Sequence, residues 1–591
     1  MSTKRRFWTC AILALPILIT MFLMPFHIML PDHGAVLTTL ILIIGASGYY
    51  QSAWHAFLHH QANMNSLIAI GTGVTYLYSL YAFFNGKDVY FESAAFITVF
   101  MLLGDMLEEK MRSQASDSLS ELLKLQANHA LVKRDDKFVD LPIDEIKIGD
   151  LVQVRPGDRI PIDGEIVEGK SEVNEAAITG ESKLQVKGIG DQVYGATVNT
   201  TGAFILRVTK TSKETVLAQI VSFVRKAQTS KAPIQKLTDR VANYFVPIVL
   251  IIGIITFWAW SMIEPAQALE RSIAVIIIAC PCALGLATPT AMIVGIGQAA
   301  KLGILIKNGT SLEKANNIET VVFDKTGTLT TGDLSVKEVT GENTLQVAAD
   351  LEQYSEHPIA RAILKDQHPR PVSDFKTVPG LGVTAKQNGH LLMAGNAKFF
   401  DRPNDDRIFV GIDHQLIGTI KLEDMPKSEA KSALAQLPYR KVMMTGDNER
   451  IAKEIADSVG ITEFYANQLP QDKAEHIQKL SNVAFVGDGI NDAPALSVAK
   501  LGIVMGSGSE IALESGDIII TNNNLHQIKR ALDISKRVFQ KIKLNLFWAS
   551  IYNLIGIPIA AIFTLSPVIA SLAMALSSVS VVLNSLTLKK P

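Results

Sequence analysis

The chain has 591 residues, of which 48% are apolar, and its formal net charge is −1. It is too long for one domain and too apolar for an ordinary soluble protein, so we expect a membrane protein with large soluble parts. The charge gives no indication of nucleic-acid binding, and three cysteines (Cys10, Cys280 and Cys282) exclude a disulfide framework.

Apolar runs long enough to cross a bilayer, which takes about 20 residues, are the first predicted elements. They occupy 7–30, 35–58, 63–84, 241–263, 272–300 and 544–588. The last run is roughly twice the required length and is interrupted at 565–567, so it predicts two spans. A further span is predicted at 89–111, where Glu92 and Asp105 interrupt the apolar pattern. Eight spans result, with both termini on one side.

Basic residues at 4–6 and at 589–590 place the termini in the cytoplasm, because positive flanking residues tend to stay inside. The first run has one alternative interpretation, a signal peptide. It is long for a signal peptide, lacks a small-residue cleavage pattern and leads directly into a second span. We therefore expect an integral membrane protein with cytoplasmic termini.

Two soluble segments, 113–233 and 317–540, separate the spans. The first contains short alternating strands divided by Gly and Asp turns, which is typical of a small all-β domain. The second alternates apolar strands with helical stretches, which predicts a parallel sheet of βαβ units.

Acidic and polar residues follow three predicted strands of the second segment. Asp324 ends the strand in VVFDKTGTLT (321–330), where a parallel sheet places its ligands and a carboxylate can attack a phosphate. An isolated acid there more often caps a turn. Asp488 in VGDGINDAP (486–494) is suited to share Mg²⁺ with Asp324. The backbone of Thr445 in MMTGDNER is suited to hold phosphate oxygens, with Lys473 neutralising charge, as phosphoryl transfer requires.

With DKTGT present in full beside GDGIND, the sequence resembles the P-type ATPases from its first span to its last, including the order of domains. The resemblance implies an all-β actuator domain and an α/β, HAD-like (haloacid dehalogenase-like) phosphorylation domain that carries an inserted α+β nucleotide-binding domain. The implied boundaries are four spans in 1–112, the actuator in 113–233, two spans in 234–316, the phosphorylation domain in 317–333 and 418–540, the nucleotide-binding domain in 334–417, and two spans in 541–591.

The resemblance also implies roles for individual residues. Asp324 is autophosphorylated by ATP and Mg²⁺, and Asp488 helps to hold the metal. Glu181 in ITGES, with Thr179 and Gly180, positions the water that hydrolyses the aspartyl-phosphate, although a lone T-G-E is normally an exposed turn. The remaining implied catalytic residues are Thr326, Thr445, Asp447, Lys473, Asn491 and Asp492. The implied nucleotide contacts are Glu352, His357, Gly380, Gly382 and Asn396, with Ala385 where the family usually has a third glycine.

The transported ion is inferred from the stretch IIIACPCALGLATPT (276–290). Cys280 and Cys282 flank Pro281, which kinks a helix and frees carbonyl groups, so both sulfurs can face one cavity. Sulfur ligands favour Cu(I). The alternative is that buried cysteine acts as a small apolar residue.

The last two spans narrow the choice of ion. Residues 544–588 contain no acid, Lys or Arg, whereas pumps for divalent ions are expected to carry charged groups there. Similarity to copper(I)-transporting members completes the site with Tyr552, Asn553, Met574 and Ser578. The same similarity implies that the ion enters past Met64, Glu92 and Asp239.

The expected function is ATP-driven export of Cu(I) from the cytoplasm through an aspartyl-phosphate. The alternatives are a Zn²⁺ or Cd²⁺ pump and, from another class, a membrane-anchored phosphatase or copper sensor that transports nothing. We expect a bacterial inner membrane, a monomer and a soluble copper chaperone as partner.

The chain departs from the family pattern near its start. It begins directly with a span, without the upstream CxxC module of most relatives. Gly45 and Ala46 replace the family's double glycine in the second span, where a kink is expected. His55, His59 and His60 lie where relatives have basic residues, so they are either a pH-sensitive docking platform for the chaperone or inert interfacial groups.

Overall fold

The computed structural model describes residues 1–23, 33–59, 63–86, 88–123, 126–135, 137–179, 184–355, 357–403, 407–489, 492–506, 516–563 and 565–589. These residues form two compact units. The first unit combines Met1–Asn316 with Ala531–Pro591, and the second is Asn317–Arg530.

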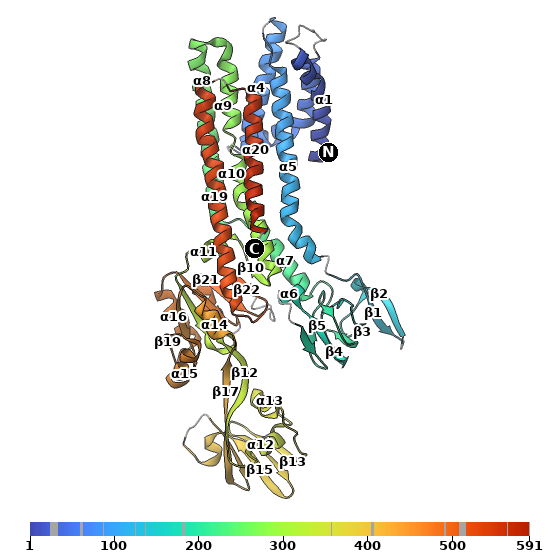
Figure 1. The fold of residues 1–591 in the computed structure, drawn as a ribbon, viewed down its shortest axis with the longest axis vertical. Coiled ribbons are helices and arrows are strands. Elements are labelled where there is room, and N and C mark those ends of the chain that lie inside the picture. Colours follow the sequence, from blue (N-terminus) through green and yellow to red (C-terminus); the bar gives the residue numbers. More distant parts are fainter. Residues whose placement is uncertain are drawn as a thin grey trace. The chain divides into compact units, whose positions relative to one another are not determined.

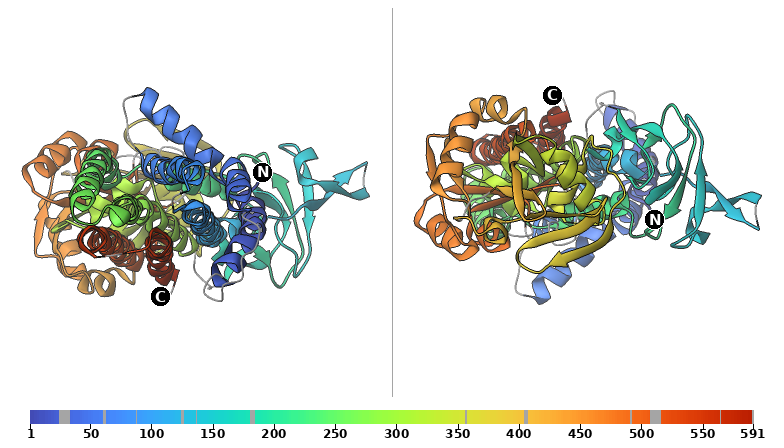
Figure 2. Two further views of the ribbon diagram at one scale, coloured as in Figure 1. Left: turned by 90° about the horizontal axis from the view of Figure 1, so that it is seen from above. Right: turned by 90° about the horizontal axis from the view of Figure 1, so that it is seen from below.

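Long helices dominate the first unit and run side by side, as the side view in Figure 1 and the view along them in Figure 2 show. They are α1 (Thr3–Leu23), α2 (Gly34–Ile41), α3 (Ser47–Leu58), α4 (Met64–Phe84), α5 (Phe91–Leu123), α8 (Pro233–Ile263), α9 (Pro265–Ile278), α10 (Cys282–Lys301), α19 (His526–Ile562) and α20 (Pro567–Leu586). Among the described residues, six helical stretches are long and apolar enough to span a membrane. These are Gly34–Leu58, Met64–Phe84, Val216–Ile263, Pro265–Lys301, His526–Ile562 and Pro567–Lys589.

Apolar side chains cover both the inside and the outside of this bundle. Ile41, Leu67 and Ile97 are fully or almost fully buried between helices. On the outside of α8, Ile255 and Trp258 are about three-fifths exposed, at 60% and 62%. A soluble protein rarely exposes a continuous apolar surface of this kind, so the outer faces are suited to lipid.

A π-helical turn, η2 (Leu42–Ala46), separates α2 from α3 at the position where the sequence predicts a kink. A Cβ atom on Gly45 would lie 2.9 Å from both Cys10 Sγ and Thr98 Cγ2. Only glycine at this position therefore allows α1 and α5 to pack so closely against the turn, and the π turn redirects the chain there.

The β-rich part of the first unit consists of two sheets with strand orders β2-β1-β3-β9-β4-β7 and β6-β5-β8. Ile160, Ile166 and Leu206 are completely buried in its core. The strands are β1 (His129–Arg134), β2 (Lys137–Pro142), β3 (Leu151–Val154), β4 (Gly164–Gly169), β5 (Ser171–Asn174), β6 (Gln185–Lys187), β7 (Gln192–Val193), β8 (Val198–Asn199) and β9 (Phe204–Val208), followed by the helix α7 (Val216–Thr229).

A parallel sheet with the order β22-β21-β20-β11-β18-β19 forms the centre of the second unit. Its strands are β11 (Thr320–Asp324), β18 (Arg440–Met444), β19 (Glu463–Tyr465), β20 (Val483–Gly487), β21 (Leu501–Met505) and β22 (Ile518–Ile520). The flanking helices include α15 (Glu449–Val459), α16 (Pro470–Lys479) and α17 (Ala493–Val498). Central strands of such sheets are covered on both faces, which explains why every residue of Thr320–Asp324 and Val483–Gly487 is buried.

A second, antiparallel sheet of this unit has the order β12-β17-β16-β15-β14-β13. Its strands are β12 (Thr330–Thr340), β13 (Ser373–Val378), β14 (Gly382–Gln387), β15 (His390–Gly395), β16 (Ile408–Ile412) and β17 (Gln415–Pro426), packed with α12 (Thr344–Glu352) and α13 (Pro358–Leu364). The long strands β12 and β17 carry the chain out of the parallel sheet and back. The expected boundaries of the inserted domain, 333/334 and 417/418, fall inside these two strands.

Candidate functional site

Three strand ends meet at one edge of the parallel sheet. β11 pairs in parallel with both β18 and β20. β11 ends at Asp324, β18 ends one residue before Thr445, and β20 ends one residue before Asp488. Because parallel strands place their carboxyl ends at the same edge, the spacing of these motifs along the chain becomes proximity in space.

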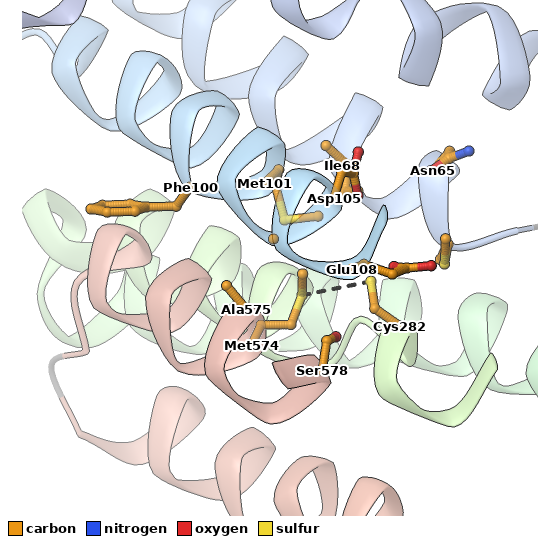
Figure 3. A pocket seen from close by; sticks show the side chains of 12 residues that line it. Asn65, Ile68, Phe100, Met101, Asp105, Glu108, Cys282, Met574, Ala575 and Ser578 are labelled. Atoms are coloured by element: carbon orange, nitrogen blue, oxygen red, sulfur yellow. Dashed lines mark hydrogen bonds between the residues drawn. The ribbon is translucent and has the colours of Figure 1, made fainter. Parts of the chain in front are cut away.

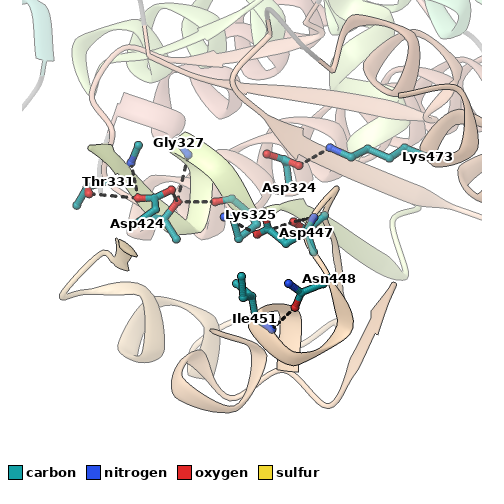
Figure 4. Close-up of polar contacts among 12 residues, drawn as sticks. Asp324, Lys325, Gly327, Thr331, Asp424, Asp447, Asn448, Ile451 and Lys473 are labelled. Carbon is teal, nitrogen blue, oxygen red and sulfur yellow. Dashed lines mark hydrogen bonds and ion pairs between the residues drawn. The ribbon is translucent and has the colours of Figure 1, made fainter. Parts of the chain in front are cut away.

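Two lysines neutralise the acids at this edge (Figure 4). Lys473 on α16 is ion-paired with Asp324 and, at 2.8 Å, with Asp492. Lys325 Nζ lies 2.5 Å from Asp447 Oδ2, and the Thr445 hydroxyl donates to the same carboxylate oxygen at 3.2 Å.

Burial controls the protonation of this cluster. It raises the pKa of Asp324 to about 7, with help from Asp492, and these effects outweigh the attraction of Lys473. Burial also raises the pKa of Asp492 despite the ion pair. Burial opposes the charge of Lys473, but the two carboxylates outweigh it and raise the pKa of the ammonium group. Perturbation of this kind is characteristic of functional carboxylates.

The charges of this cluster suit a divalent cation, although no group of three or more acids, Cys or His among the described residues is arranged to hold one. When all four carboxylates (Asp324, Asp447, Asp488 and Asp492) are ionised, they exceed the two ammonium groups by two negative charges, which one Mg²⁺ would neutralise. Among the described residues, the buried Asp492 Oδ2 and Thr328 Oγ1 have no hydrogen-bond partner. A buried polar atom without a partner is costly, so these oxygens are suited to a ligand.

The loop after Asp324 provides the remaining backbone groups. Gly327 adopts φ 70°, a left-handed conformation that favours glycine, and Thr326 precedes it with extended geometry. Asn491 lies outside the described residues. So do Gly180 and Glu181, while Thr179 ends the short helix α6 (Ala176–Thr179), where its hydroxyl donates to the Glu175 carbonyl at 3.0 Å.

The expected nucleotide contacts form two groups on the inserted sheet and its helices. Glu352 is buried at the end of α12, and burial raises its pKa, although Ser355 and His357 oppose this. His357 is exposed and caps α13, because its Nδ1 accepts a hydrogen bond from the Ile359 backbone N–H at 3.3 Å.

The second group lies between β13 and β15. Asn396 Nδ2 donates to the Gly380 carbonyl at 2.8 Å and so ties the glycine turn to the end of β15. Gly380 has φ 74°. A Cβ atom on Gly382 would lie 2.6 Å from the Cα of Gly395, so this position requires glycine for close strand packing. Ala385, in place of the family's third glycine, is buried in the sheet.

The two membrane cysteines lie at a break in a helix, as expected from Pro281. α9 ends at Ile278 and α10 begins at Cys282. Both thiols are buried, and their sulfur atoms are 2.6 Å apart. Asn553 Nδ2 donates to the Ala279 carbonyl, which the break leaves without a helical partner, at 3.4 Å.

A cavity of about 20 Å³ opens beside Cys282, slightly larger than the roughly 10–15 Å³ that one water needs. Met574 Sδ lies 4.0 Å from Cys282 Sγ, and Ser578 and Met64 also line the cavity. Figure 3 shows Asp105 and Glu108 of α5 in the same wall. Neither is among the site residues that the sequence predicts, although an acid within an apolar span is the signal for Asp105.

Three residues predicted for ion entry or binding lie away from this cavity: Glu92, Asp239 and Tyr552. Glu92 lies in the first turn of α5, beside Phe91, which makes an edge-to-face contact with Phe83 in the last turn of α4. Met64 begins α4, so the length of a helix of 21 residues, about 30 Å, separates it from Glu92. Glu92 therefore lies far from Met64, whereas Glu108 shares the cavity wall with Met64.

Asp239 is half exposed and ion-paired with Lys231 at 3.0 Å. Tyr552 is 45% exposed on α19, although its neighbour Asn553 reaches the helix break. His55 and His59 are exposed on α3, and His60 lies outside the described residues.

Comparison with known proteins agrees with this combination of sites. A family profile described as the P-type ATPase actuator domain matches residues 124–225, and one described as haloacid dehalogenase-like hydrolase matches residues 318–500. The chain is 41% identical to a copper-exporting P-type ATPase of Staphylococcus haemolyticus, over 99% of this chain and 80% of the relative. A copper-exporting P-type ATPase of Staphylococcus aureus is also 41% identical, over 98% and 78%.

A solved structure of a zinc-transporting PIB-type ATPase matches with a TM-score of 0.62 and 26% identity, over 99% of both chains. A second structure of a zinc-transporting PIB-type ATPase, in another state of its cycle, matches with a TM-score of 0.56. With relatives this similar over most of their length, the chain belongs to the P-type ATPases.

Proposed function

We propose that this P-type ATPase exports Cu(I) from the cytoplasm by hydrolysing ATP. The observation that carries the proposal is the sulfur set at the helix break, where Cys280, Cys282 and Met574 approach one another. Thiolate and thioether ligands select Cu(I) over hard cations. Relatives with 41% identity are copper-exporting P-type ATPases, which supports the same choice.

Asp324 is the proposed nucleophile. One carboxylate oxygen attacks the γ-phosphorus of ATP, the bond to ADP breaks, and an aspartyl-phosphate forms. Lys473 holds the attacking group and neutralises charge on the phosphoryl oxygens, while the Thr445 and Thr326 region supplies backbone donors. Asp324, Asp488 and Asp492 would hold Mg²⁺, which supplies charge neutralisation at the transferred phosphate.

Hydrolysis is assigned to the actuator loop. Water attacks the phosphorus of the aspartyl-phosphate, phosphate leaves, and the Asp324 carboxylate is restored. Glu181 would position this water, with Thr179 and Gly180 shaping the loop and Asn491 completing the acceptor site. The adenine nucleotide would be held by the residues described on the inserted domain: Glu352, His357, Gly380, Gly382 and Asn396.

Eight spans are proposed for the membrane part, because α1 and α5 pack in the same bundle as the six long apolar stretches. Both termini then lie in the cytoplasm, in a bacterial plasma membrane. In this orientation Met64 and Glu108 face the cytoplasm and admit the ion, whereas Glu92 lies on the outer side. We retain the all-β actuator, the domain boundaries given above, the monomer and delivery by a soluble chaperone as parts of the proposal.

The test is ATP hydrolysis by the purified full-length chain in lipid nanodiscs. Cu(I) should stimulate turnover, and Asp324→Asn should abolish it. Cys280→Ser and Cys282→Ser should each abolish the stimulation while ATP binding is retained. Asp366→Asn, a change on the surface of the inserted domain, serves as the control. A rate of ATP hydrolysis that neither Cu(I) nor Zn²⁺ changes would favour the non-transporting phosphatase.

A second candidate, a Zn²⁺ or Cd²⁺ pump, is favoured by one specific observation. The final spans contain no acid, yet Asp105 supplies a carboxylate to the same cavity from α5. Zn²⁺ accepts sulfur and carboxylate oxygen together. Stimulation by Zn²⁺ and none by Cu(I) would replace the copper assignment with this one.

A further inference from the structure

Asp105 is an acid that lies within an apolar helix of the membrane bundle. It lies on α5 in the wall of the cavity that also contains Cys282. Its Oδ2 accepts a hydrogen bond of 2.5 Å from the hydroxyl of Tyr49, a buried residue of α3. Within the described part of the chain, no Lys, Arg or His forms an ion pair with Asp105. A charge in a membrane bundle is expensive, so an acid kept there is by default a functional candidate.

Tyr49 determines the direction of the carboxylate. A hydrogen bond to one oxygen holds the carboxylate in one orientation in the cavity wall. Outer partners of this kind commonly orient metal ligands.

Charge balance decides which cation suits this wall. Two thiolates around a monovalent ion carry a net charge of −1. An added carboxylate around a divalent ion restores the same net charge, and Glu108 in the same wall adds negative charge that favours the divalent ion further. Zn²⁺ and Cd²⁺ accept sulfur, and Zn²⁺ also binds Asp oxygen in tetrahedral sites. Cys282, Asp105 and Met574 line one cavity and so offer it both sulfur and carboxylate oxygen.

We propose that Asp105, oriented by Tyr49, is a specificity-determining residue. It lets the cavity accept a divalent ion of the Zn²⁺ class as an alternative to Cu(I). The inference rests on the proposed function, because it assumes that the cavity holds the transported ion. Pumps for divalent ions are expected to carry a charged group in the last two spans, and in this proposal Asp105 on α5 takes its place. The pump then has a main substrate selected by sulfur and a second one admitted by Asp105.

The experiment uses the full-length chain in lipid nanodiscs and measures two quantities for Cu(I) and for Zn²⁺. One is metal-stimulated ATP turnover, and the other is the metal retained per chain after desalting, measured by mass spectrometry. The variants are Asp105→Asn, Asp105→Glu and Tyr49→Phe. Glu109→Gln is the matched control, because Glu109 lies on the same helix but is exposed.

For the wild type we expect stimulation by both ions. In Asp105→Asn the ratio of Zn²⁺ to Cu(I) stimulation should fall at least about tenfold, because even a group that only orients a ligand is worth about 10–100-fold in metal affinity. Retained Zn²⁺ should fall in parallel. Asp105→Glu should keep most of the ratio, and Glu109→Gln should keep all of it.

Several outcomes would overturn the inference: a wild type indifferent to Zn²⁺, or an Asp105→Asn protein with an unchanged ratio. If Asp105→Asn does not fold, Tyr49→Phe decides, since it keeps the carboxylate but frees its orientation and should lower the ratio about tenfold, as loss of an orienting partner typically does. Zn²⁺ stimulation that depends on Asp105 in a protein that ignores Cu(I) would support Asp105 and overturn the copper assignment. The two proposals can therefore fail separately.

Discussion

Replacement of Lys473 by Met tests the charge arrangement around the proposed nucleophile. Lys473 is buried and contacts the carboxylates of both Asp324 and Asp492. Met has a similar length but no charge, so the substitution removes the cation and little volume. The two carboxylates then share a buried edge of the sheet without the ammonium group between them.

The expected effects on stability and rate follow from this geometry. Loss of one partner of a buried ion pair costs about 3–5 kcal/mol, and 3 kcal/mol corresponds to roughly a hundredfold change in an opening equilibrium. Hydrogen exchange in β11 and β20 should therefore accelerate by at least about a hundredfold. Loss of one fixed group that stabilises transition-state charge typically costs about 10²–10³-fold in rate, and we expect this loss in phosphoenzyme formation.

Rapid-quench labelling with γ-labelled ATP measures the phosphorylation rate in a single turnover. Lys479→Met is the matched control, because Lys479 is exposed on the same helix and should leave both quantities within about twofold, as surface changes usually do. Lys473→Arg should keep the fold but phosphorylate slowly, because its planar group does not replace a compact ammonium. Phosphorylation of Lys473→Met within threefold of wild type would refute the role of this cation.

Three further substitutions test other parts of the chain. Asn553→Leu leaves the Ala279 carbonyl unpaired, a cost of about 1–3 kcal/mol, so the Cu(I) concentration for half-maximal ATP turnover should rise roughly tenfold. Glu352→Gln removes a buried carboxylate whose charge is unfavourable, as its raised pKa indicates, so α12 should become more stable and its hydrogen exchange should slow. Because Glu352 is a proposed nucleotide contact, a titration with labelled nucleotide should show weaker ATP binding. Burial lowers the pKa of Lys427 from 10.5 to about 8. Between about pH 8 and pH 10.5 the unfolded chain therefore binds more protons than the folded chain. The free energy of local unfolding near β17 should rise with pH across this interval by at most about 3 kcal/mol, and Lys427→Met should remove the rise.

The catalytic edge could be predicted because its signals are local. Each of Asp324, Thr445 and Asp488 directly follows an apolar strand, and the rules for parallel sheets convert that pattern into a shared edge. The break at Pro281 was predictable for the same reason, since proline removes a helical hydrogen bond wherever it stands. Neither inference needed the packing of distant segments.

The cavity was harder to predict because its walls come from helices far apart in the sequence. Glu92 and Glu108 lie on the same helix, yet sixteen residues, about 24 Å of rise, separate them. A sequence shows that both are acids near the ends of an apolar span but not which end faces Met64. Asp105 was visible as an acid in an apolar pattern, and only the packing of α3, α5 and α10 shows that it shares a wall with Cys282.

The two sites differ in how their acids are neutralised, and this difference connects structure to mechanism. At the sheet edge, lysines pair with Asp324, Asp447 and Asp492, because the site must accept a phosphate, itself an anion, together with one divalent metal. In the membrane cavity the charge of Asp105 is met only by a hydroxyl among the described groups. An acid left without a cation in a membrane is stabilised when a positive ion arrives, so in the proposed function the transported ion offsets part of the cost of keeping Asp105 charged.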